Sequence, residues 1–338
     1  MGKRLDNERK LYNMKYVKLG NTNIEVSKIC IGGMSFGEAS SNFHEWTLNQ
    51  EETTKMIKEA YDLGVNFIDT ANCYSFGTSE KFIGNAIKEL KIPRDKIVIA
   101  SKVYFNDGKL SGEAIKREIE KTLNNLQTDY LDLYQIHRFD YDTPIEETMR
   151  ALNDLVISGK VRAIGASAMY GYQFHNMQIM AERLGLSLFS IMQNHYNLLY
   201  REDKRELIPI CKEYNVSLIP YSPLAGGHLT HLNWNSDSLR SQTDKTLRKK
   251  YDAQMNNDLL IFERVAELAK KYNVSMAQIS LAWLFKKGIS SAIVGAIKLN
   301  HFVDACKAVD LELNDEDMIY LEELYTHKPI VGALPEGK

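Results

Sequence analysis

The stretch FIDTANCYSFGTSEKFIG, residues 67 to 84, contains the pattern that decides the fold. An apolar run ends on Asp69, a loop of small polar residues carries Tyr74, and an amphipathic pattern then begins. A buried strand, a loop and a helix in this order are typical of one β–α unit of a parallel sheet. Taken alone, the stretch also fits a purely structural interpretation, in which Asp69 caps a turn and Tyr74 packs.

Working outward, the same unit repeats from end to end of the chain, and we count eight. Most of the apolar runs are apolar almost throughout, which is typical of strands covered on both faces in a parallel sheet. No linker rich in Pro, Ser or Gly divides the units, so the sequence predicts one domain over residues 1–338, an α/β chain folded as a closed (β/α)8 barrel. The predicted strands are KICIGG, VNFIDT, KIVIASK, YLDLYQIH, VRAIGAS, SIMQN, VSLIPYS and SAIVGA.

Several features frame this repeat. Residues 1–14 form a polar N-terminal extension, and YVKLGNTNIEVSKI is predicted to be a β-hairpin outside the repeat. Gly64 and Gly159 are placed to end helices, and Ser111 to begin one. The connection from His228 to about Asn257, after the seventh strand, is long enough to indicate a functional loop. A last helix is expected around residues 315–325.

Composition excludes several classes of function. The 338 residues are 44% apolar and 25% charged, and 42 basic residues nearly balance 44 acidic ones. This balance argues against nucleic acid or an anionic membrane as the main partner. No apolar run approaches a membrane span, the N-terminus lacks a signal peptide's apolar centre, and the four cysteines have no paired spacing. We therefore expect a cytoplasmic protein with reduced thiols.

Polar side chains stand at the ends of three consecutive predicted strands. Asp69 ends the second strand, Lys102 the third and His137 the fourth, with Tyr74 in the loop after Asp69. Because neighbouring strands lie about 4.8 Å apart, these side chains can converge within hydrogen-bond reach. Each alone has an ordinary structural explanation, but the four together indicate a catalytic site.

The chemistry expected of this set is proton donation by the phenol. A lysine cation beside Tyr74 lowers the pKa of the phenol from its usual ~10, and Asp69 keeps Lys102 charged. His137 is suited to orient an oxygen of the substrate. Motifs for dinucleotide-binding sheets, phosphate loops, zinc or serine hydrolases do not occur. A metal held by His137, Asp140 and Asp142 would leave the Lys–Tyr pair unexplained.

These residues resemble a known family. DTANCYSFGTSE, SKV and QIHR, in this order, are similar to motifs of the aldo-keto reductases, in the branch with potassium-channel beta subunits and microbial aldehyde reductases. The resemblance covers almost the whole chain. It implies a (β/α)8 barrel that transfers hydride between NADP(H) and a carbonyl or alcohol, with NADPH as the cofactor. It makes Tyr74 the acid, Lys102 and Asp69 its tuners, and His137 the orienting residue.

The resemblance also implies a cofactor site. Ser167 and Gln193 would hold the carboxamide, and Tyr221 would stack on the nicotinamide. Residues of the long loop and the last strand would hold the phosphates, with Gly295 opening a helix that faces the 2′-phosphate, and Asp304 would contact the adenine. The full set is Gly33, Met34, Asp69, Ser167, Gln193, Tyr221, Ser222, Leu224, Gly226, Arg240, Gly295, Lys298, His301 and Asp304.

The expected partner is a small-molecule carbonyl substrate, and the sequence indicates no oligomeric state. An apolar mouth for that substrate is predicted from side chains after the strand ends, namely Met34, Phe36, Tyr104, Phe105, Phe139 and Tyr141. One alternative is a regulatory or redox-sensing subunit that binds NADPH with little turnover. His137 favours the enzyme, because the channel-subunit branch commonly has asparagine there. Phosphate-sugar isomerisation or metal chemistry on the same barrel is a further alternative.

Overall fold

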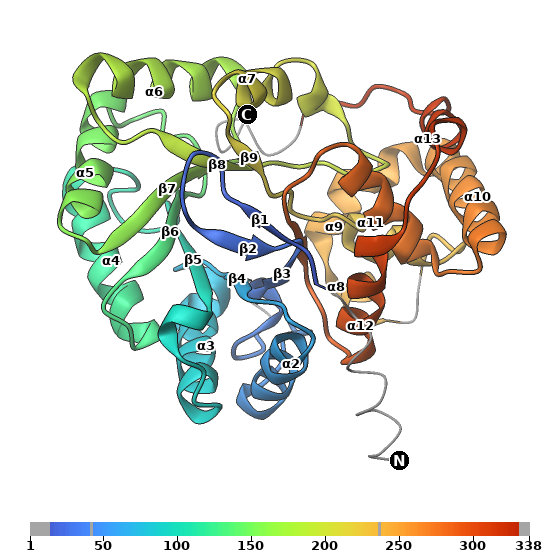
Figure 1. Ribbon diagram of the computed structural model, residues 1–338, viewed down its shortest axis with the longest axis horizontal. Helices are drawn as coiled ribbons and strands as arrows, with labels where there is room; N and C mark the ends of the chain where they lie inside the picture. Colours follow the sequence, from blue (N-terminus) through green and yellow to red (C-terminus); the bar gives the residue numbers. More distant parts are fainter. Residues whose placement is uncertain (1–13, 41–42, 236–237, 331–338) are drawn as a thin grey trace.

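The computed structural model describes residues 14–40, 43–235 and 238–330, and its centre is a parallel eight-stranded sheet (Figure 1). All eight predicted strands are present, so the predicted barrel is confirmed. Their bounds are β3 Ile29–Gly32, β4 Phe67–Asp69, β5 Val98–Val103, β6 Leu131–Ile136, β7 Val161–Ser167, β8 Phe189–Gln193, β9 Ser217–Leu218 and β10 Ala292–Val294.

The sheet closes on itself. Each strand from β3 to β8 pairs with its successor in the chain, and β10 pairs with β3. The remaining gap lies between β9 and β10. Two backbone hydrogen bonds cross it, from Ser290 N to Leu218 O (3.0 Å) and from Ile293 N to Pro220 O (3.3 Å). The carboxyl ends of all eight strands therefore meet at one end of the barrel.

Helices surround the barrel in chain order, as Figure 1 shows. The predicted ends hold: Gly64 and Gly159 have left-handed φ angles of +87° and +76°, and the Ser111 hydroxyl accepts from Ala114 N. The helices are α2 Gln50–Asp62, α3 Thr78–Glu89, α4 Gly112–Leu126, α5 Ile145–Ile157, α6 Gly171–Leu184, α7 Leu207–Glu213, α10 Met255–Tyr272, α11 Met276–Lys286, α12 Asn300–Lys307 and α13 Asp315–Glu322. The expected helix start at Gly295 is wrong, because α12 begins at Asn300.

An apolar layer fills the amino-terminal half of the barrel. It is sealed by the predicted hairpin, which forms from β1 Tyr16–Lys18 and β2 Glu25–Ser27. The layer takes one or two inward side chains from each strand and three from the hairpin segment. Its members are Leu19, Ile24, Val26, Cys30, Phe67, Val98, Ala100, Leu133, Ala163, Ile191, Ile219 and Ile293. These side chains are at most 8% exposed, so this half of the barrel is packed with apolar side chains.

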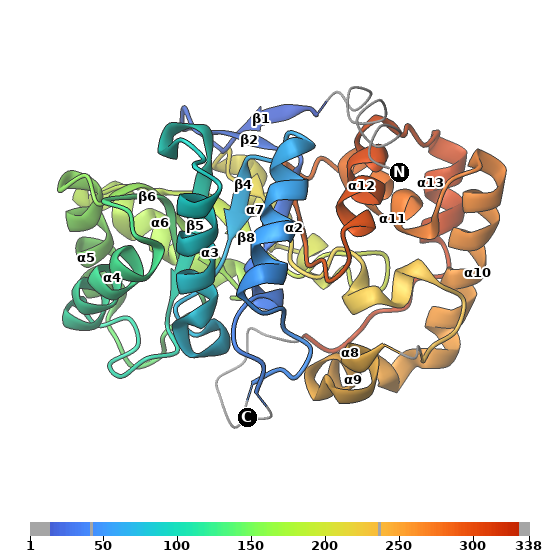
Figure 2. The same cartoon turned by 90° about the horizontal axis from the view of Figure 1, so that it is seen from below.

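The long connection after β9 lies at the other end of the barrel. It contains two short helices, α8 Leu239–Thr243 and α9 Lys245–Tyr251, which we call the strap. Figure 2 shows the strap and the hairpin at opposite ends of the barrel. Across the described ranges, no helix is long and apolar enough to cross a membrane. Most of the predicted N-terminal extension and residues 331–338 lie outside the described part of the chain.

Candidate functional site

A layer of four polar side chains lies in the barrel, at the carboxyl ends of its strands. Lys102 Nζ donates to Asp69 Oδ2 at 2.6 Å. The other carboxylate oxygen, Oδ1, accepts from Gln135 Nε2 at 2.8 Å and from Gln193 Nε2 at 2.9 Å. All four side chains are almost fully buried. Each charge or amide in this layer has a partner, as burial of such groups requires.

Tyr74 reaches this layer through Lys102. The loop after β4 winds into a short turn, Tyr74–Gly77, which brings the phenol oxygen to 3.2 Å from Lys102 Nζ. Lys102 also donates to the Thr70 carbonyl at 2.7 Å. The ammonium therefore has three oxygen partners and a fixed position between Asp69 and Tyr74.

His137 follows β6 and lies beside the phenol. Its ring is 5.7 Å from that of Tyr74, centroid to centroid, at an interplanar angle of 79°. Its backbone N donates to Val103 O at 2.9 Å, which continues the parallel pairing beyond the strand. The structure thus brings together all four residues predicted as a catalytic set.

The protonation states differ in one respect from the sequence expectation. Burial raises the pKa of Tyr74 to about 12, and the Lys102 cation only partly opposes this shift. The expected net lowering is therefore wrong in direction. Burial lowers the pKa of Lys102, but the charges of Asp69 and Tyr74 outweigh it, so this pKa lies above its usual value. Burial, Lys102 and Arg138 hold the pKa of His137 well below its usual value.

The two residues expected at the carboxamide lie next to each other. The Ser167 hydroxyl donates to the Gln193 carbonyl at 2.9 Å, and the Gln193 side chain is held by Asp69 and Gln135. Both side chains are almost fully buried. They border the polar layer on the side of β7 and β8.

Tyr221 stands beyond them with both faces covered. One face stacks on His195, with centroids 4.9 Å apart and planes at 13°. Lys250 of the strap lies over the ring, with Nζ 4.7 Å from the centroid. Burial, with the Arg138 cation, lowers the pKa of Lys250 to about 8. A ring stacked on Tyr221 would thus have to displace Lys250.

The backbone after Tyr221 has an unusual conformation. Ser222 and Ala225 have left-handed φ angles of +51° and +49°, and Gly226 and Gly227 have +67° and +112°. Two N–H groups of this stretch have backbone partners: Ala225 N donates to Ser222 O at 3.0 Å, and Gly227 N donates to Leu224 O at 2.9 Å. Leu224 is half-buried, and Leu247 of the strap packs directly against Gly226.

Arg240 of the strap lies close to the last strand. One of its terminal nitrogens is 4.0 Å from where a Cβ on Gly295 would stand. The guanidinium also lies 4.5 Å from the Trp46 ring centroid and bonds Asp244 at 3.3 Å. Nearby in the chain, Lys298 is exposed and His301 half-buried. Burial lowers the pKa of His301, so Arg240 and Lys298 are the cations of this region. Arg240 beside the exposed Gly295 is suited to bind a phosphate.

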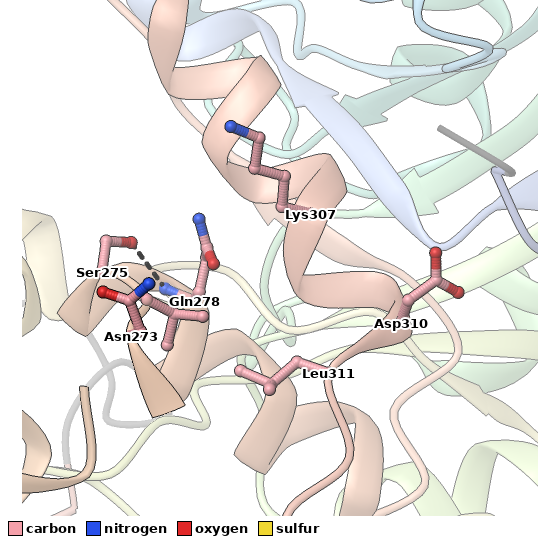
Figure 3. Close-up of a pocket in the computed structure, with 7 residues that line it drawn as sticks. Asn273, Ser275, Gln278, Lys307, Asp310 and Leu311 are labelled. Carbon is pink, nitrogen blue, oxygen red and sulfur yellow. Dashed lines mark hydrogen bonds between the residues drawn. The ribbon is translucent and has the colours of Figure 1, made fainter. Parts of the chain in front are cut away.

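Asp304 is engaged elsewhere. Its carboxylate accepts from the Ser275 hydroxyl at 2.6 Å and from the Gln278 amide, so it ties α12 to the start of α11. Ser275 and Gln278 also line a surface groove of about 670 Å³, together with Lys307 and Asp310 (Figure 3). The groove contains none of the predicted site residues.

The residues directly after β3 lie beside Asp69 of the polar layer. Gly33 begins a short turn, and its carbonyl accepts from the Ser79 hydroxyl at 2.7 Å. A Cβ at Gly33 would lie 3.0 Å from Asp69 O, so no larger residue fits without displacement. Met34 is half-buried.

An aromatic wall borders Tyr74 and His137 toward solvent. Phe105 is 5.1 Å from His137, and Phe43 lies 6.3 Å from Tyr74 and 6.1 Å from Phe76 (ring centroids). Phe76 is 70% exposed and has a left-handed φ of +55°, an uncommon conformation for an aromatic residue. Of these three phenylalanines, Phe105 belongs to the predicted mouth, whereas Phe43 and Phe76 were not predicted. Of that prediction, Phe139 is half-buried and Tyr141 exposed, whereas Phe36 and Tyr104 are core residues.

Other residues of the site escaped prediction. Gln135 stands two residues before His137 in the same strand, and this period-two spacing could have placed it inside the barrel. Cys73 lies beside His137. Its position directly before Tyr74 in the sequence could have indicated that it belongs to the site. Lys250 lies in α9 of the strap and Trp46 in the loop after β3, and the sequence does not indicate the course of either segment over the barrel.

A metal centre finds no support in the described ranges. No group of three or more His, Cys, Asp or Glu side chains in them could hold an ion. Two residues considered for this role have other partners: Asp140 accepts from the Leu110 and Asp142 backbones, and Asp142 binds Lys109.

Comparison with known proteins identifies the family of this fold. The model of the aldo/keto reductase family matches residues 28–326. A Schizosaccharomyces pombe protein named as an aryl-alcohol dehydrogenase is 44% identical, over 94% of this chain and 98% of its own length. Versiconal hemiacetal acetate reductase of Aspergillus parasiticus is 39% identical, over 94% and 98%. A crystal structure of a thermostable aldo-keto reductase with the inhibitor epalrestat has 29% identity and a TM-score of 0.75, over 92% of this chain and 100% of that chain.

The buried ion pair yields a prediction about stability. Lys102→Met should lower the free energy of unfolding by about 3–5 kcal/mol, because it leaves the Asp69 charge buried without its partner. Urea denaturation measures this loss.

The matched control is Lys55→Met. Lys55 binds Glu51 at the same 2.6 Å, but on an exposed helix face. The Lys55→Met substitution should cause no measurable loss in the free energy of unfolding, because solvent screens that pair. Equal stability of the Lys102 variant and the control would contradict the role given to the buried pair.

Proposed function

Because the chain belongs to the aldo/keto reductase family, and so is an oxidoreductase, we propose that it reduces aldehydes and ketones to alcohols with NADPH, using Tyr74 as the general acid. The observation that carries this proposal is the position of Lys102 Nζ, 2.6 Å from Asp69 Oδ2 and 3.2 Å from the Tyr74 oxygen. A phenol beside a fixed cation, at the open end of a barrel, is arranged to release a proton to a bound oxygen.

Tyr74 holds the proton until the reaction needs it. With its pKa at about 12, the phenol is fully protonated at neutral pH. When the proton leaves, the phenolate forms beside Lys102, whose charge stabilises it. General acid catalysis of this kind typically accelerates a reaction ~10²–10⁴-fold. Neutral His137 is placed to hold the substrate oxygen next to the phenol.

NADPH, when bound, supplies the hydride. The residues present suit it, because Arg240 beside Gly295 offers a guanidinium to a phosphate. We assign Gly226, in the left-handed stretch after Tyr221, to the pyrophosphate. We assign Ser167 and Gln193 to the carboxamide and Tyr221 to the nicotinamide ring. Gly33, Met34, Ser222, Leu224, Lys298, His301 and Asp304 complete the proposed set.

The substrate class that fits best is aromatic aldehydes. Phe43, Phe76 and Phe105 present ring faces and edges around Tyr74 and His137, and such pairs favour a planar ring between them. The name of the Schizosaccharomyces pombe relative, an aryl-alcohol dehydrogenase, supports the same class.

The first prediction concerns the acid itself. Tyr74→Phe should lower kcat by about 10²–10⁴ while leaving the Kd for NADPH nearly unchanged, because only the transferable proton is lost. NADPH oxidation followed by absorbance, with benzaldehydes and aliphatic aldehydes, measures the rate. Tyr272→Phe, at the end of α10, is the control and should behave as wild type. A fully active Tyr74→Phe enzyme would contradict the proposed mechanism. Tight NADPH binding by the wild-type protein without turnover of any carbonyl would favour a regulatory subunit.

The second prediction concerns pH. Between about pH 7 and about pH 9, kcat for reduction should be flat, because Tyr74 stays protonated below its pKa of about 12 and His137 stays neutral above its lowered pKa. Stopped assays across this range, with stability checked at each pH, measure the profile. A tenfold fall per pH unit beginning below about pH 9 would show that the phenol titrates near neutrality instead.

The third prediction separates the two nucleotides. Arg240→Ala should weaken NADPH by about tenfold or more and NADH much less, because the guanidinium is assigned to the phosphate that only NADPH carries. Fluorescence titration of both nucleotides measures this difference. Arg248→Ala, an exposed arginine of the same strap, is the control. Equal losses for both nucleotides would remove Arg240 from this role.

A further inference from the structure

Cys73 is the residue directly before Tyr74, and its side chain reaches the second proposed catalytic group. Its Sγ lies 3.8 Å from Nδ1 of His137, within hydrogen-bond range for sulfur. The turn holds it there: Tyr74 N donates to Ala71 O at 3.2 Å, and Phe76 N donates to Cys73 O at 3.1 Å. The thiol is half-buried, and the same short segment therefore fixes both the phenol and the contact to the imidazole.

The two protonation states allow the thiol to be the donor in this hydrogen bond. Burial raises the pKa of Cys73 to about 11, so the sulfur keeps its hydrogen at neutral pH. His137 is neutral, because burial, Lys102 and Arg138 lower its pKa. A neutral imidazole has one N–H and one acceptor nitrogen, so a thiol donor at Nδ1 leaves the ring hydrogen on Nε2.

We propose that Cys73 is a positioning residue: its S–H donates to Nδ1 of His137 and keeps the hydrogen of the imidazole on Nε2. The inference rests on the proposed carbonyl reduction, in which His137 holds the substrate oxygen. With hydrogen on Nε2, His137 donates to that oxygen beside the Tyr74 O–H. With hydrogen on Nδ1, Nε2 would present a lone pair that repels the carbonyl oxygen and accepts the Tyr74 proton itself.

Two substitutions at this position test the idea. Cys73→Ala removes the donor, whereas Cys73→Ser keeps an O–H in nearly the same place. The ¹⁵N chemical shifts of the His137 ring report the tautomer without any turnover, and steady-state kinetics with a benzaldehyde report its consequence. NADPH affinity and thermal unfolding are measured for each variant.

We expect the hydrogen on Nε2 in wild type and in Cys73→Ser, and a mixture of tautomers in Cys73→Ala. The alanine variant should lose about three- to tenfold in kcat/KM, the value of one neutral hydrogen bond, and the serine variant less than about twofold. Hydrogen on Nδ1 in wild type would overturn the proposal, as would equal losses in both variants or no loss in either. If wild type reduces no carbonyl, the proposed function fails, and the ¹⁵N shifts still decide the tautomer.

Discussion

The ion pair between Lys102 and Asp69 is the interaction on which the site depends. Both charges lie inside the barrel, where an unpaired ion would cost several kcal/mol. Asp69 is held by three donors, and Lys102 is directed by Asp69 and the Thr70 carbonyl toward Tyr74. The phenol therefore meets a cation that has no freedom to swing away, which is the preorganisation that electrostatic catalysis requires.

This polar layer is possible because of what lies beneath it. The amino-terminal half of the barrel is filled with aliphatic and aromatic side chains and sealed by the hairpin. The ion pair itself is almost fully buried. Burial also raises the pKa of Tyr74, so burial and the cation act on this group in opposite directions.

Much of the fold was predictable because its signals are local. Each strand is nearly continuous in apolar residues, and parallel pairing then aligns Asp69, Lys102 and His137 on neighbouring strands. The direction of the Tyr74 pKa was not predictable, since desolvation depends on which segments cover the phenol. For the same reason Lys250 over Tyr221 was missed: its position follows from the path of a long loop. The start of α12 was misplaced because a glycine after a strand signals a turn as readily as a helix.

The contact between Trp46 and Arg240 links the loop after β3 to the strap. The aromatic wall comes from loops after β3, β4 and β5, whereas most proposed nucleotide ligands come from β7 onward. Substitutions in the aromatic wall should therefore act mainly on the proposed substrate, because only Gly33 and Met34 among the proposed nucleotide residues lie in the same group of loops. A substitution at Trp46 differs, because it alters the loop after β3 and the surroundings of Arg240 at the same time. The proposed substrate and nucleotide sites are therefore coupled through this contact.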